Sequence, residues 1–401
     1  MIVNIDPPSF KKAPEPTGLD RFPVLSYAFR PLYFFGTLFC LISLIEWTAG
    51  YKGTPQLPFQ LWHAHEMIYG FVGTIIVGFL LTAVRTWTGL VTAKNAELIV
   101  LLFFWFVARI AVYGGEQGLW LAFMANVLFY GYATYLFAKP IIQSKNKRNY
   151  IPIGILFCLL LSLCGFDLTV LTRHTLWAMN FMYVGISVVL SVVCLIAMRV
   201  LPFFTARRLG TNQMVIPPSM QKWGMLVPIF IAVLMVFKHI DAAVWVAFVL
   251  SLYVAYCLFF MLKGTYVKTM WTEPMLWILH LAVFFVALGA PFLYFFMAID
   301  SKFMDSAMHM MTVGGISAII LGMMARTSLG HTGRMMRAVP PMPWAFRLIF
   351  VAMLIRVCLR FAQTDVQYHM IWGASAVFYI LAFALFLGRY GLWLWQKSES
   401  K

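Results

Sequence analysis

Two histidines and a glutamate stand at the start of a long apolar run, in the segment WHAHEM (residues 62–67). Imidazole nitrogens bind haem iron and copper, and a neighbouring carboxylate can orient an imidazole ring or exchange a proton with it. If the segment is helical, each residue turns about 100° around the axis, so His63 and His65 point in nearly opposite directions. His63 then shares its face with Glu66, and His65 shares its face with Tyr69. The pattern predicts two separate tasks for the histidines rather than one chelated ion.

A second apolar run repeats this arrangement. It contains AMHMMTVGG (residues 307–315), in which His309 precedes two glycines. With a rise of about 1.5 Å per residue, His309 lies within about one helical turn of the depth of His65. Two imidazoles at one depth on separate helices are the geometry of a bis-histidine haem. Hydrogen bonds from buried histidines to neighbouring helices explain the pattern equally well.

Two further features of these runs bear on a cofactor. The glycines after WHAHEM, at positions 70, 73 and 78, permit the close approach of another helix or of a flat macrocycle. Methionine thioethers bind copper(I), and four methionines surround His309 at positions 304, 308, 310 and 311. Methionine is also a common packing residue, so this second signal is weaker.

The composition indicates that these runs lie in a membrane. The 401 residues are 62% hydrophobic and 11% charged, whereas a soluble domain needs roughly twice that charged fraction. Runs of about 20 apolar residues follow one another from Phe29, and they are too continuous for the strands of a barrel. We predict an all-α, polytopic membrane protein with about twelve transmembrane helices. They lie near residues 30–49, 61–86, 96–114, 118–138, 150–166, 175–200, 222–238, 241–262, 273–298, 303–325, 343–361 and 368–392.

Basic residues predict the orientation of these helices. Of the 30 Lys and Arg residues, 23 fall in the tails and the even-numbered links, which places both termini in the cytoplasm. We expect an N-terminal tail over 1–28 without a cleavable signal, one transmembrane domain over 29–393 and a C-terminal tail over 394–401. Anionic lipid accounts for the net charge of +16, so no nucleic-acid partner is expected.

Several other polar residues are candidates for a site. Arg109, Arg356 and Arg360 lie toward the outer ends of their helices, against the charge gradient. Haem propionates would offer them partners, and snorkelling to lipid headgroups is the alternative. His280 lies about two turns inside the cytoplasmic end of its helix, and His331 lies in a cytoplasmic link. The remaining histidines, at positions 174, 239 and 369, are expected to anchor helix ends at the interface.

Several segments, in order along the chain, together resemble the NnrS family of bacterial inner-membrane proteins. They are AFRPLYFFG (28–36), LWHAHEMIYGF (61–71), VGFLLTAVRTWTG (77–89), MRVLPFFT (198–205), Leu279-His280, and AMHMMTVGGISAIILGMMARTSLGHTGR (307–334). The resemblance implies about twelve helices, haem and copper, and an association with denitrification, nitric oxide and nitrosative stress. The absence of a C-x-x-C-H segment favours b-type over c-type haem.

The histidines of the family fall on His63, His65, His280, His309 and His331. As axial haem ligands we favour His65 and His309. His63 is then a copper ligand, an alternative axial ligand or a support for its neighbour. His280 serves a separate metal unless its helix is shifted toward His309, and His331 is either a ligand or part of the turn that ends its helix.

The predicted function is the handling of nitric oxide or another diatomic ligand by a haem-containing membrane protein. Glu66 or Tyr69 would tune the pocket through hydrogen bonds. An oxidoreductase with a separate electron donor, an electron-transfer protein and a sensor all remain compatible with the sequence. The alternative from another class is a secondary transporter, which should concentrate its polar groups near the middle of the bilayer.

Overall fold

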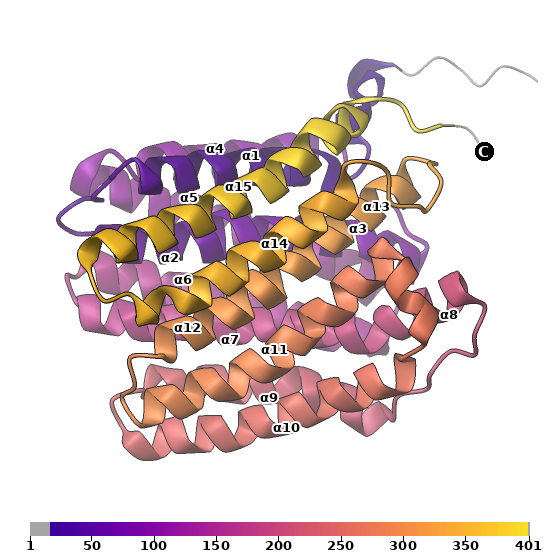
Figure 1. The fold of residues 1–401 in the computed structure, drawn as a ribbon. Coiled ribbons are helices and arrows are strands. Elements are labelled where there is room, and N and C mark those ends of the chain that lie inside the picture. The colour runs from indigo at the N-terminus through magenta and orange to yellow at the C-terminus, as the bar shows by residue number, and fades with distance from the viewer. Residues whose placement is uncertain (1–16, 400–401) are drawn as a thin grey trace, which may run out of the picture.

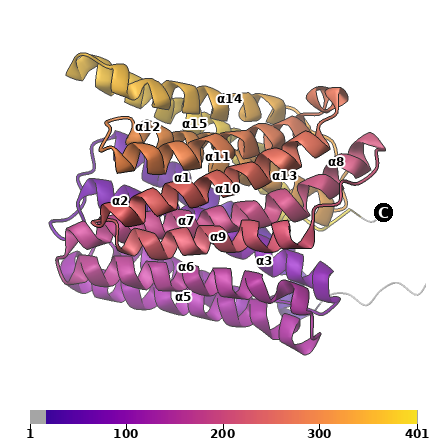
Figure 2. The same cartoon turned by 90° about the horizontal axis from the view of Figure 1, so that it is seen from below.

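The computed structural model describes residues 17–399, which form one bundle of long helices (Figures 1 and 2). The α-helices are α1 (Phe29–Thr48), α2 (Phe59–His65), α3 (Gly73–Thr88), α4 (Ala96–Ala111), α5 (Gly115–Gln143), α6 (Tyr150–Leu171), α7 (Thr175–Arg199), α8 (Leu201–Leu209), α9 (Pro218–Val236), α10 (Asp241–Thr265), α11 (Pro274–Ala298), α12 (Met304–His309), α13 (Ala318–His331), α14 (Met342–Val357) and α15 (Asp365–Trp395). Two π-helical segments, η3 (Glu66–Val72) and η6 (Met310–Ser317), join α2 to α3 and α12 to α13.

The predicted all-α membrane architecture is confirmed. Among the described residues, 11 helical segments are long and apolar enough to cross a membrane. The predicted helix near 96–114 corresponds to α4, which has 16 residues and is shorter than the roughly 20 that a full span requires. Helix α4 nevertheless packs along α5 and runs along the long axis of the bundle. The chain therefore reverses direction at both ends of α4 (Figure 1).

Several helices extend beyond the apolar runs that predict them. The predicted span 150–166 ends at Leu171, and the predicted span 303–325 ends at His331. His331 is therefore the last residue of a helix instead of a link residue. An apolar-run criterion stops at polar residues, whereas a helix continues as long as neighbouring helices offer partners to those side chains.

The two ends of the described chain lie at the same end of the bundle, here called the terminal end (Figure 1). The opposite end is called the far end. At the terminal end the Asn95 amide donates to Asp20 Oδ1 over 2.6 Å, and the Lys94 ammonium lies 3.6 Å from the same oxygen. The Asn95 hydrogen bond and then the Lys94 charge hold the pKa of Asp20 below its usual range.

Arg30 joins the first and last helices at this end. Its side chain is buried, and it donates to the carbonyls of Leu394 (3.0 Å) and Gln396 (2.6 Å) and to Ser398 Oγ (2.8 Å). These acceptors include carbonyls at the end of α15 that lack partners inside the helix. The guanidinium therefore caps α15 from the first turn of α1.

We expect Arg30→Met to lower the free energy of unfolding by about 2–3 kcal/mol, because hydrogen bonds from a charged donor are lost and carbonyls stay buried. Thermal and SDS-induced unfolding in detergent would measure the loss. Arg389→Met is the matched control, since that arginine of α15 is exposed and lies over the Trp393 ring. A loss for Arg30→Met no larger than that of the control would contradict the capping role.

Candidate functional site

Both helices that carry the predicted haem ligands change from α-helical to π-helical bonding directly after a histidine. In one, α2 ends at His65 and η3 begins at Glu66, and in the other, α12 ends at His309 and η6 begins at Met310. A π-helical turn shifts backbone hydrogen bonds from i+4 to i+5 and is frequent at functional sites. The two positions are therefore candidate site positions on backbone geometry alone.

The carbonyls of η3 are bonded by side chains of neighbouring helices. Tyr130 donates its hydroxyl to the Tyr69 carbonyl over 2.6 Å, and the Trp105 indole donates to the Gly70 carbonyl over 3.2 Å. Gly73 leaves the space that the Tyr130 hydroxyl occupies, because a Cβ there would overlap it. The glycines after WHAHEM thus make room for protein side chains. At Gly73 the space that a flat macrocycle could have used is filled by the Tyr130 hydroxyl.

His63 and His65 point to opposite sides of α2, as the helical period predicts. The His63 ring stacks on Trp47 of α1 with centroids 3.8 Å apart, whereas the His65 ring lies 5.4 Å from Phe166 of α6. His65 also contacts Tyr69, as expected. Glu66 does not share the side of His63, because it bonds to His65 and π-helical spacing begins at this residue.

The first group of polar residues, the His65 cluster, lies between α2, α4, α5 and α6. His65 Nδ1 donates to Glu66 Oε1 over 2.8 Å, and Arg109 forms a close ion pair with Glu66. Arg109 also donates to Asn126 Oδ1 over 2.6 Å, and Asn126 Nδ2 lies 3.5 Å from Asp167 Oδ2. The distance from Asp167 Oδ1 to His65 Nε2 is 3.0 Å. All five side chains are buried, so the cluster is a closed polar network within the bundle.

The second group, the His63 cluster, lies at the far end between α1, α2, α12 and α14. His309 Nδ1 donates to the Asp305 carbonyl over 2.8 Å and lies 3.2 Å from the Asp305 carboxylate, so Nε2 carries the lone pair when the ring is neutral. The Asp305 carboxylate lies 3.2 Å from Arg356 and 3.5 Å from Arg360. His63 is close enough to His309, Asp305 and Arg356 to interact electrostatically with them. Its buried Nδ1 has no hydrogen-bond partner.

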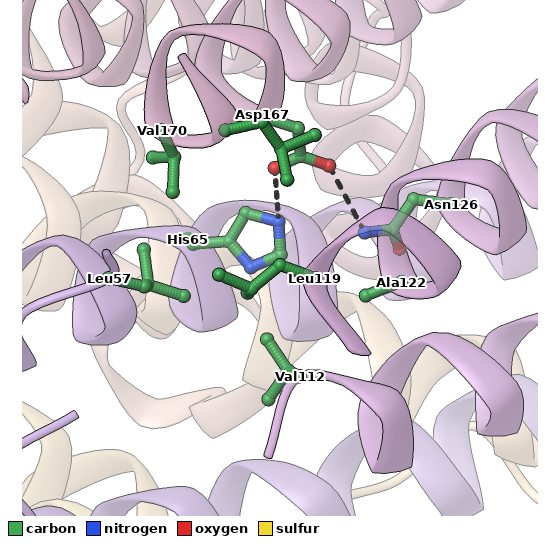
Figure 3. A pocket seen from close by; sticks show the side chains of 9 residues that line it. Leu57, His65, Val112, Leu119, Ala122, Asn126, Asp167 and Val170 are labelled. Carbon is green, nitrogen blue, oxygen red and sulfur yellow. Dashed lines mark hydrogen bonds and ion pairs between the residues drawn. The ribbon is translucent and has the colours of Figure 1, made fainter. Parts of the chain in front are cut away.

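The two clusters differ in charge. The His65 cluster holds the carboxylates of Glu66 and Asp167 against one arginine, so negative charge is in excess when the imidazole is neutral. The His63 cluster holds two arginines against one carboxylate, so positive charge is in excess there. Because buried charges require partners, the first cluster is balanced when His65, which faces the Asp167 carboxylate (Figure 3), is protonated, and the second suits an anionic group.

The other predicted site residues lie apart from both clusters. In α11, His280 lies near the terminal end, where Nδ1 is 3.0 Å from the Leu276 carbonyl and Nε2 is 3.2 Å from Thr265 Oγ1. His331 ends α13 at the terminal end, with its ring 5.5 Å from Tyr27 and 5.7 Å from Phe29. The structure therefore places His63 and His309 within electrostatic range of each other, whereas His280 and His331 lie at the opposite end of the bundle.

Three polar residues of these clusters were not expected from the sequence: Asn126, Asp167 and Asp305. Each stands within or beside an apolar run, and ionisable or amide side chains at membrane depth are functional candidates by default. Asp167 directly follows the predicted end of its helix at residue 166, so the apolar run predicts that it belongs to a link. The sequence signal for Asp167 and Asp305 is that each is an isolated acidic residue at an end of an apolar run.

Comparison with known proteins agrees with the resemblance that the motifs suggest. A family model described as "NnrS protein" matches residues 23–398, nearly the whole chain. Among curated proteins, none matches the chain. The matched region contains both clusters, α1 through α15, and every histidine. The chain belongs to the NnrS family.

Proposed function

We propose that this protein binds a redox-active metal centre, haem or copper, at His63 and His309 and uses it in the nitric oxide response. Membership in the NnrS family supports the nitric oxide response. The observation that carries the site is the buried His63 Nδ1 without a hydrogen-bond partner, within electrostatic range of His309 from the other π-interrupted helix. Imidazole nitrogens from two helices fit haem iron and copper.

The residues around this pair would hold such a centre. Trp47 stacks flat on His63 and fixes the plane of its ring. The Asp305 carbonyl orients His309 by accepting from Nδ1, in the manner of the outer partner of a ligating histidine. Arg356 and Arg360 carry the positive charge that a haem propionate or another carboxylate would neutralise.

The chemistry of the bound group would be the coordination of nitric oxide, and the chain supplies access and charge. Nitric oxide partitions into lipid, so a centre among apolar helices can meet it without a water channel. His63 and His309 would hold the centre, and the positive charge of the arginine pair would attract an anionic group beside it. We further propose that the terminal end, which carries most of the basic residues, faces the cytoplasm across the bacterial inner membrane.

Absorption spectra of the purified protein would test the site. We expect a Soret band if the centre is haem, and copper in the metal analysis if it is not. His63→Ala and His309→Ala should each abolish or shift that signal, because each removes one ligand. His174→Ala is the control, since this exposed residue precedes α7. Signals of wild-type strength in both cluster variants would contradict the proposal.

The same experiment separates this pair from the axial pair that the sequence predicted. If His65 and His309 were the ligands, then His65→Ala would remove the signal and His63→Ala would leave it. Spectra recorded after reduction, with and without nitric oxide, would show whether the ligand binds at the metal.

A further inference from the structure

We propose that Arg326 binds the phosphate group of an anionic membrane lipid at the terminal end of the bundle, between α8, α11 and α13. Arg326 belongs to α13, its guanidinium lies over the Phe204 ring of α8, and its Nη1 is 3.5 Å from the Met275 carbonyl of α11. Helix α8 lies at the terminal end in both views of the bundle (Figures 1 and 2). This inference is independent of the proposed function, because it uses neither His63 nor His309.

Arg326 has fewer partners than the other buried arginines of the described chain. Arg109 and Arg356 each pair with a carboxylate, and Arg30 donates to three oxygens within 3.0 Å. Arg326 is only 6% exposed, yet it makes one long contact to a carbonyl, and its Nε has no hydrogen-bond partner. A guanidinium carries five N–H donors and a fixed charge, so its burial without acceptors is unfavourable. An anionic acceptor would supply what the protein does not.

The charged groups nearby do not neutralise Arg326. It interacts electrostatically with Arg208, which carries the same sign. Arg208 is itself paired with Glu273, whose two carboxylate oxygens lie 2.9 and 3.0 Å from its Nε and Nη2. Among residues 17–399, no carboxylate forms an ion pair with Arg326. One positive charge therefore remains without a counter-ion at this place.

The Phe204 ring sets the direction in which Arg326 can bind. The Arg326 Cζ atom lies 3.8 Å from the centre of the ring, a separation at which the guanidinium is in van der Waals contact with the aromatic face. The N–H groups of a guanidinium point outward within its own plane, so a ring on one face does not cover them. Two such groups match two oxygens of a phosphate.

A small apolar cleft beside Phe204 distinguishes a lipid from a free anion. The cleft is lined by apolar side chains of α7, α8, α11 and α13 and of the joint between α7 and α8, among them Val200, Phe204, Leu279 and Met323. Met323 precedes Arg326 by about one helical turn, so the cleft and the guanidinium lie on the same side of α13. A lipid offers an anionic phosphate joined to hydrocarbon, which matches a cation beside an apolar cleft.

The depth of Arg326 also fits a lipid phosphate. The continuous helix Met304–His331 has 28 residues, so it is about 42 Å long and exceeds the hydrocarbon core of about 30 Å. Arg326 lies about 7–8 Å from the end of this helix. A helix centred on the core places Arg326 near the boundary between hydrocarbon and headgroups. Basic pockets between helices at the cytoplasmic boundary are typical sites for anionic headgroups.

Native mass spectrometry of the purified, delipidated, full-length protein would test this site. Phosphatidylglycerol is titrated in parallel with phosphatidylcholine, whose choline cation cancels the phosphate charge. We expect one phosphatidylglycerol to bind in preference, and Arg326→Met should weaken its binding by at least about 10-fold. Arg347→Met is the matched control, because this exposed arginine of α14 also lies over an aromatic ring, that of Trp344. The control should change the affinity by less than about 2-fold.

Three results would overturn the proposal. Arg326→Met with wild-type affinity removes the site, and an equal loss in Arg347→Met shows that surface charge alone attracts the lipid. Displacement of the lipid by millimolar inorganic phosphate assigns the site to a soluble anion. If Arg326→Met does not fold, Phe204→Leu decides instead, because it keeps the charge and removes the ring that fixes the guanidinium, so unchanged affinity in this variant contradicts the site.

The same samples keep this inference apart from the proposed function. Arg326→Met leaves His63 and His309 in place, so its absorption spectrum and metal content should equal those of the wild type. A loss of lipid binding with an unchanged spectrum supports the lipid site alone, and a loss of the spectrum in Arg326→Met would contradict its independence from the metal centre.

Discussion

Arg109→Met is expected to lower the free energy of unfolding by about 3–5 kcal/mol, since it leaves the Glu66 carboxylate buried without its cation. Arg109 is 4% exposed and Glu66 is fully buried, so water cannot replace either partner. The arginine also donates to Asn126, and its loss would free the amide that holds Asp167. SDS-induced unfolding in mixed micelles would measure the change.

A double variant isolates the charge from the packing. Glu66→Gln removes the negative charge and keeps the shape, so Arg109→Met/Glu66→Gln should cost less than the sum of the single variants by about 1–3 kcal/mol. The matched control is Arg173→Met, because the ion pair of Arg173 with Glu116 is exposed at the far end and should contribute about 0–1 kcal/mol. Additive costs in the double variant would show that the buried pair is not coupled.

Asp305→Asn is expected to lower the free energy of unfolding by about 2–3 kcal/mol. The partial exposure of Arg360 makes this less than the full cost of a buried unpaired charge. Asparagine keeps the shape of the side chain but removes the only carboxylate of the His63 cluster. Arg356 and Arg360 then face each other without a counter-ion. The His309 ring still bonds to the backbone carbonyl of residue 305, so its orientation should persist.

Two measurements would separate stability from binding. Thermal unfolding should show the loss for Asp305→Asn, and Arg360→Gln added to it should restore part of that loss by removing one of the two positive charges. If His63 and His309 hold the proposed centre, metal content at low temperature, where both proteins are folded, should stay near that of the wild type, because both histidines remain. Unchanged stability of Asp305→Asn would contradict the claim that Asp305 balances the charge of Arg356 and Arg360. A complete loss of metal from this variant would instead indicate that Asp305 binds the metal.

The sequence predicts the directions of some side chains in the site but not of others. The opposite directions of His63 and His65 follow from the helical period over residues 59–65, where the structure is α-helical. The side on which Glu66 lies does not follow, because the hydrogen-bonding pattern changes at that residue. The apolar run does not predict a helical position for Asp167, because the helix extends beyond the end of that run.

The sequence does not predict which residues lie beside each histidine. Depth alone matches His309 with His65 as well as with His63, since both lie near the same end of the bundle. The structure assigns His63 to the side of Trp47 and α12, and it assigns His65 to the side of α5 and α6. That choice depends on the rotation of α2 about its axis, which no feature within its own segment specifies.

The sequence by itself determined the membrane environment, the long apolar helices and the histidines that are candidates for a site. These properties are local, because in lipid each segment must satisfy its own backbone hydrogen bonds and must be long enough to cross. Only the tertiary structure decided which polar residues meet. Asp167 contacts His65 although 102 positions of the chain separate them. Asp305 forms an ion pair with Arg356, which lies 51 positions later in the chain. Such contacts are set by helix rotation and packing, and here two π-helical turns change that rotation directly after the histidines.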